Sequence, residues 1–189
     1  MTRPTRRGFL IGGVPFAIAG CLGPELGYDD ETPFPADEND APFGSAELQR
    51  IIDFAEDSMA AIEEATDALQ SWRRDADAIP LDDVDQLRIR ATALLSTYWN
   101  RVVPYEDALT DLDAGESVNG VQWDGNGEAL VSVFRDHETA LHAIEEASIG
   151  IVNAEGDPDR ISSMTNEAID FIIEESREII EDTRVAIGD

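Results

Sequence analysis

The chain has no lysine and a single cysteine, Cys21, among its 189 residues. One cysteine cannot form an intrachain disulfide or supply a multi-cysteine metal site. Long hydrophobic runs are missing as well, because no apolar stretch reaches the roughly 18 residues that a membrane-spanning helix needs. These absences exclude a disulfide-stabilised fold, a cysteine-rich zinc site and an ordinary transmembrane segment.

Positive charge is also scarce. The 13 arginines oppose 41 acidic residues, which gives a formal net charge of −28 at pH 7. Three of these arginines precede the first acid, Glu25, so ten arginines oppose all 41 acids after Cys21, a balance of −31. Such a surface repels phosphate backbones and excludes nucleic acid as a partner.

The acidic residues lie among Leu, Ile, Val and Ala at regular spacing, which is not the composition of a disordered chain. In molar salt the screening length falls to about 3 Å, so crowded carboxylates no longer repel one another across the surface. Arginine without lysine fits this setting, because the guanidinium is weakly hydrated. The composition resembles that of proteins from salt-loving archaea, and an acidic protein of a mesophile is the alternative.

Residues 1–20 have the layout of an export signal, a basic start followed by a short apolar region. The pair Arg6-Arg7, followed by Phe9 and Leu10, resembles a twin-arginine (Tat) signal, which exports proteins that have already folded. The resemblance implies export through the Tat pathway.

The motif Ile18-Ala19-Gly20-Cys21 resembles the lipobox of bacterial and archaeal lipoproteins. The resemblance implies that a membrane lipid is attached to the Cys21 thiol and that the mature protein lies at the outer face of the cell membrane. Two alternatives stay open. Either Cys21 is a small buried residue, or the apolar segment is retained as an anchor, for which its glycines and Pro15 are unfavourable.

Residues 21–44 follow with four prolines and with seven acids between Glu25 and Asp40. Proline prevents a helix, and like charges extend the chain. We therefore expect a disordered acidic linker behind the lipidated cysteine. By random-coil scaling, it holds a domain about 30 Å from the lipid on average.

From Ser45 onward, apolar residues recur at spacings of three and four, which predicts amphipathic helices. The predicted helices span about 46–74, 82–113, 128–154 and 158–187. Pro104 should kink the second helix near Asn100 or divide it. The pattern favours an all-α, up-and-down four-helix bundle over residues 45–189, preceded by the signal peptide and the linker.

Capping residues indicate where these helices begin. Ser45 and Asp82 are the expected N-caps of the first two helices. Asp157 is the expected cap of the fourth helix, with Pro158 at its first position.

Glu138, His142 and Glu145 form a weak candidate metal site, since spacings of four and three place them on one helix face. The favoured alternative is a solvated flank on which the carboxylates pair with the histidine. The other histidine, His137, lies five residues before His142, so the two rings face different sides of the helix. A zinc-protease motif needs its two histidines four residues apart, and it is therefore excluded.

His137 falls within the apolar stripe of its helix, where a hydrogen-bonded core histidine is the ordinary outcome. If its partner were a carboxylate of another helix, it could act as a pH-sensitive lock.

Trp123 lies in the glycine-rich segment 115–127, which we expect to be an exposed loop. An exposed aromatic side chain there would be a possible partner contact. The equally weighted alternative is a lid over the bundle end. Asp124–Glu128 resembles the start of a calcium loop, but it lacks the later ligands, so a turn leading into the next helix is expected.

No serine or cysteine nucleophile with a paired base is evident, and no cofactor is expected. The sequence favours a non-enzymatic, lipid-anchored envelope module that contacts an unknown envelope protein. The alternative is a ligand-sensing or solute-binding bundle, whose ligand would lie near Pro104 and the Trp123 loop. A metal-handling protein or an enzyme is the least favoured class.

We expect the fold to loosen when salt is removed, because unscreened carboxylates then repel one another. The test is thermal unfolding followed by circular dichroism in molar and in millimolar KCl. The cooperative transition should shift to lower temperature and broaden as salt falls. An equally cooperative and unshifted transition in dilute buffer would contradict the salt-adapted interpretation.

Overall fold

The computed structural model describes residues 43–112 and 114–188, and all of them belong to one compact unit of the chain. These residues are predominantly helical, with almost no strand, which confirms the all-α class. Within them, no helix combines the length and the apolar character that crossing a membrane requires. The long helices are α1 (Ser45–Arg74), α2 (Leu81–Thr97), α4 (Gly127–Asn153) and α5 (Ser163–Ile187).

The N-terminal predictions concern residues outside this description. They comprise the Tat motif, the lipobox with Cys21, and the linker as far as residue 42. The described chain begins at Phe43, whose ring lies 6.0 Å from that of Tyr105.

Shorter elements connect the long helices. They are the 3₁₀ turn η2 (Ala76–Ala78), the π-helical turn η3 (Tyr98–Val102), the 3₁₀ turn η4 (Val103–Tyr105), the helix α3 (Glu106–Thr110), the strands β1 (Ser117–Val118) and β2 (Val121–Gln122), and the 3₁₀ turn η5 (Pro158–Arg160).

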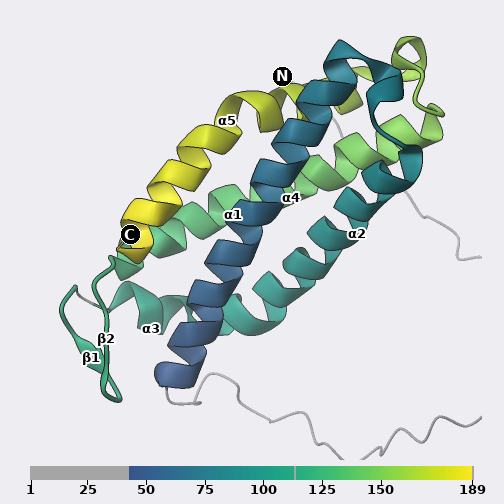
Figure 1. Cartoon of the computed structure of the whole chain (residues 1–189). Helices are drawn as coiled ribbons and strands as arrows, with labels where there is room; N and C mark the ends of the chain where they lie inside the picture. Colours follow the sequence, from purple (N-terminus) through teal and green to yellow (C-terminus); the bar gives the residue numbers. More distant parts are fainter. Residues whose placement is uncertain (1–42, 113, 189) are drawn as a thin grey trace, which may run out of the picture. The chain divides into compact units, whose positions relative to one another are not determined.

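Helix α4 is the central packing element. It contacts α1, α2, α3 and α5, and α1 also contacts α2 and α5. In Figure 1, α1 (blue) lies between α5 (yellow) and α2 (teal), with α4 behind it. The apolar side of each long helix faces this common core. Its largest fully buried side chains are Trp72, Trp123, Phe134, Leu48, Ile51, Ile62, Leu69, Leu109, Leu130, Leu141, Ile144 and Ile151.

The predicted second helix, from 82 to 113, which Pro104 was expected to kink or divide, is divided into α2, the turns η3 and η4, and α3. Proline has no N–H, so Pro104 cannot donate to the Asn100 carbonyl as an α-helix requires. The Val103 N–H instead bonds the Tyr98 carbonyl, which closes the wider π turn, and the 3₁₀ turn follows. The Tyr98 hydroxyl donates to Glu106 at 2.8 Å and so ties the π turn to α3.

Three predicted caps are corrected. The N-cap of α1 is Gly44, with Ser45 already inside the helix, and the N-cap of α2 is Pro80, which leaves Asp82 in the first turn. Asp157 caps the 3₁₀ turn that starts at Pro158, while α5 begins later with Ser162 as its cap. Gly44 and Ser162 have the extended backbone that precedes a helix, and Pro80 has φ −58° and ψ 140°.

A β-hairpin interrupts the glycine-rich segment. Ser117 pairs with Gln122 and Val118 with Val121, in antiparallel register. The turn residues Asn119 and Gly120 have φ values of 49° and 88°. Positive φ at both positions is the signature of the type I′ turn, for which Asn-Gly is the preferred sequence.

Helices α4 and α5 approach each other closely at Gly150. A Cβ atom at this position would lie 2.1 Å from the Oγ1 atom of Thr165, a buried residue of α5. Glycine therefore sets how near the two helices can pack.

We expect Gly150→Ala to destabilise the protein by about 1–3 kcal/mol, because the added methyl group overpacks the contact. At an open helical position the same change would stabilise by about 1 kcal/mol. Urea unfolding at constant salt measures the difference. The double variant Gly150→Ala/Thr165→Ala, which removes the two nearest atoms, should recover part of the loss. A Gly150→Ala variant more stable than the parent would refute the close approach.

Candidate functional site

The predicted metal site at Glu138, His142 and Glu145 is wrong. The Nδ1 atom of His142 lies 3.7 Å from Glu145 Oε2, but the other oxygen of that carboxylate lies 2.8 Å from the Thr92 hydroxyl on α2. Across residues 43–112 and 114–188, no three His, Cys, Asp or Glu side chains are placed to hold a metal ion. The Glu145 carboxylate instead joins His142 to Thr92 of α2.

Trp123 is 2% exposed, so the prediction of an exposed partner contact is wrong. Its backbone bonds Gly115 and Glu116 as a continuation of the hairpin. A Cβ at Gly125 would lie 2.5 Å from the Trp123 ring and 2.3 Å from the Ala186 carbonyl. Trp123 thus covers the core at the end of α5, as the lid alternative predicted.

The exposed tryptophan is Trp99 instead, at 54%. Its neighbour Tyr98 is buried and stacks on Phe54 at 5.9 Å between ring centroids. Burial raises the pKa of Tyr98, and its hydrogen bond to Glu106 adds to this effect. Two adjacent aromatic residues therefore divide between the core and the surface.

His137 is fully buried, and its partner is a hydroxyl group rather than a carboxylate. Its Nε2 atom lies 2.7 Å from Thr183 Oγ1 on α5. The same hydroxyl donates to the Ile179 carbonyl, so it must accept from His137. The imidazole therefore carries its proton on Nε2.

The other ring nitrogen, Nδ1, is buried and has no hydrogen-bond partner among the described residues. A charged imidazolium would have to place an unsatisfied N–H there. Burial accordingly lowers the pKa of His137 to about 4. The lock with an interhelical carboxylate, considered above, is not formed.

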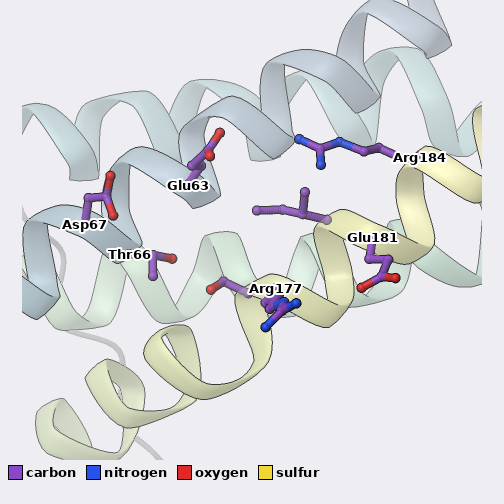
Figure 2. Close-up of a pocket in the computed structure, with 8 residues that line it drawn as sticks. Glu63, Thr66, Asp67, Arg177, Glu181 and Arg184 are labelled. Carbon is purple, nitrogen blue, oxygen red and sulfur yellow. The ribbon is translucent and has the colours of Figure 1, made fainter. Parts of the chain in front are cut away.

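An open groove of about 470 Å³ lies between α1 and α5 (Figure 2). Among its lining residues, Ser176 is buried, and Thr66 and Ile180 are half-buried. Because Thr66 and Ser176 are small, they leave space between the two helices. The charged residues that line it are exposed, and they are Glu63 and Asp67 on α1 and Arg177, Glu181 and Arg184 on α5.

Charges of opposite sign therefore line the two sides of this groove. Figure 2 shows Arg184 extending from α5 toward α1, while Glu181 points away from α1. Among the ion pairs of the described residues, none includes Arg177 or Arg184.

Elsewhere the same two helices do form an ion pair. Arg73 of α1 lies 2.5 Å from Asp170 of α5. Side chains of the same types can therefore pair between these two helices, although none of the described ion pairs crosses the groove.

The groove between α1 and α5 was not predicted from the sequence. Its signals were present as Glu63 and Asp67 four residues apart, and as Arg177 and Arg184 seven apart in a chain with few arginines. Each pair lies on one face of its helix. Nothing in the sequence says, however, that these two faces meet.

Comparison of the chain with family models, curated proteins and solved structures finds no match. Its function must therefore be inferred from its own residues.

The buried neutral His137 predicts a loss of stability in acid. Its pKa is about 4 in the folded state and about 6.5 in the unfolded state, so the unfolded chain binds the proton first as pH falls. The free energy of unfolding therefore decreases as pH falls from the unfolded-state pKa to the folded-state pKa. We expect it to be about 2–3 kcal/mol lower at pH 4.5 than at pH 7.5. His137→Gln should lack this component when urea unfolding is measured at both pH values.

The contribution of the carboxylates is common to both proteins and cancels in the comparison. These include Asp136, whose pKa is raised by burial and by nearby Asp182. His142→Gln, which changes an exposed histidine, serves as the control and should follow the parent profile. Parallel profiles for the parent and His137→Gln would show that His137 is not held neutral.

Proposed function

We propose that this protein is a lipid-anchored, non-enzymatic helical module at the outer face of the cell membrane of a halophilic archaeon. In this proposal the Tat signal exports the folded chain, and a lipid on Cys21 retains it. The linker then presents the helical domain to an envelope partner. The observation that carries the proposal is the lipobox at Ile18–Cys21, which is placed directly after the apolar region of the signal.

Two features support a binding role over catalysis. His137, a natural acid or base by residue type, is fully buried and bonded to a hydroxyl group, so a substrate cannot reach it. The surface is dominated by carboxylates that molar salt screens. On such a surface, a partner is recognised through shape complementarity and a few specific ion pairs.

The proposal includes an up-and-down four-helix bundle whose second helix is kinked at Pro104. The contacts of α1 with α2, α2 with α4, α4 with α5 and α5 with α1 support this ring order. The π turn before Pro104 supports the kink.

A second candidate function is ligand binding, as in a solute-binding or sensing protein. The groove between α1 and α5 favours it, because it has the volume of a small-molecule site. Among the ion pairs of the described residues, none includes its two arginines.

We expect Cys21→Ser to release the protein from the membrane, because the serine hydroxyl cannot take the lipid thioether. The measurement is fractionation of cells kept at native salt, followed by immunoblotting. The parent should stay in the membrane fraction until detergent is added, and Cys21→Ser should appear in the medium. Crosslinking of both forms, read by mass spectrometry, then identifies the neighbours that depend on anchoring.

The matched control replaces Arg6 and Arg7 with lysine, which keeps the charge and removes the twin-arginine motif. This variant should accumulate inside the cell as the uncleaved precursor. Membrane retention of Cys21→Ser would contradict the lipid anchor, and export of the lysine variant would contradict the Tat route.

A further inference from the structure

Five charged side chains line the groove between α1 and α5, and one of them, Glu181 of α5, points away from α1 (Figure 2). Glu63 and Asp67 project from one face of α1, and Arg177 and Arg184 project from one face of α5. Ile180 lies between the two arginines in sequence and lines the same groove. The lining therefore offers a negative side, a positive side and an apolar side chain between the arginines.

The charges that line the groove restrict what can bind here. A lone anion would leave Glu63 and Asp67 uncompensated, and a lone cation would leave the two arginines uncompensated. A molecule with one charge of each sign can contact both sides. Direct contacts of this kind survive molar salt, since they act within the screening length of about 3 Å.

We propose that this groove binds a small zwitterion that carries an ammonium group and a carboxylate, of the α-amino acid class. The carboxylate contacts the guanidinium groups of Arg184 and Arg177, and the ammonium contacts Glu63 and Asp67. The inference rests on the second candidate function, ligand binding, and is independent of the lipid anchor.

Size and polarity agree with this class. The volume of about 470 Å³ lies in the range of small-molecule sites, and Ile180 can pack against an aliphatic side chain. The Thr66 hydroxyl donates to the Ile62 carbonyl, so its lone pairs remain to accept from an ammonium. Arginine is suited to the opposite side, because its planar fork binds a carboxylate through two hydrogen bonds.

The test titrates L-leucine and glycine into the full chain in molar KCl, followed by calorimetry. Two analogues of leucine lack one charge each, namely 4-methylpentanoate, without the ammonium, and 3-methylbutylamine, without the carboxylate. We expect leucine to bind at least about tenfold more tightly than either analogue, because each analogue loses a charged hydrogen-bonded contact.

Charge-removing variants assign each end of the ligand. Arg184→Gln should weaken leucine binding about tenfold and leave 3-methylbutylamine unchanged, and Glu63→Gln should weaken leucine and leave 4-methylpentanoate unchanged. The matched controls are Arg135→Gln on α4 and Glu167→Gln on α5, two exposed residues that do not line this groove. Both controls should bind leucine as the parent does.

The inference would be overturned if neither amino acid gave a heat of binding at millimolar concentration, or if leucine and its analogues bound equally well. It would also be overturned if the groove variants and the control variants lost leucine affinity to the same extent. A ligand of another class that raises the melting temperature, with no effect of the groove variants, would also remove this assignment, although it would uphold the ligand-binding function. Cell fractionation of Cys21→Ser decides the anchoring separately.

Discussion

The burial of α4 against its neighbours is the interaction on which the rest of the structure depends. This helix contacts α1, α2, α3 and α5, and its inward side chains, among them Phe134 and Leu141, are fully buried. Gly150 brings it close enough to α5 for Thr165 to fill the space that a side chain would occupy. The hydrophobic effect supplies the driving force, since no disulfide or metal contributes among the described residues.

An apolar core of this kind contains few polar side chains, because each buried polar atom needs a hydrogen-bond partner. His137 is satisfied on one nitrogen by Thr183, which also bonds the helix backbone. Its other nitrogen is left without a partner among the described residues. The protein therefore holds a neutral imidazole between α4 and α5 as part of the core packing.

The surface, in contrast to the core, is strongly charged, because the acidic residues of the chain outnumber its arginines several-fold. Most of the described ion pairs are exposed and contribute little to stability. The groove between α1 and α5 stands apart, since its opposite charges face each other across space that Thr66 and Ser176 are too small to fill. Among the described ion pairs, none includes the arginines of this groove.

The sequence by itself determined the all-α class and the bounds of α1 and α4 to within a residue or two, because apolar periodicity is a local property. It placed the end of the second helix at about 113, whereas α2 ends at Thr97. The Asn119-Gly120 turn is equally local, but helical spacing alone does not reveal it. Only the tertiary structure decided that Trp123 is buried while Trp99 is exposed, that Thr183 rather than a carboxylate bonds His137, and that Glu63 faces the same groove as Arg184. These outcomes depend on how each helix is rotated and shifted against its neighbours. That arrangement is set by the packing of all the core side chains together, which no single segment encodes.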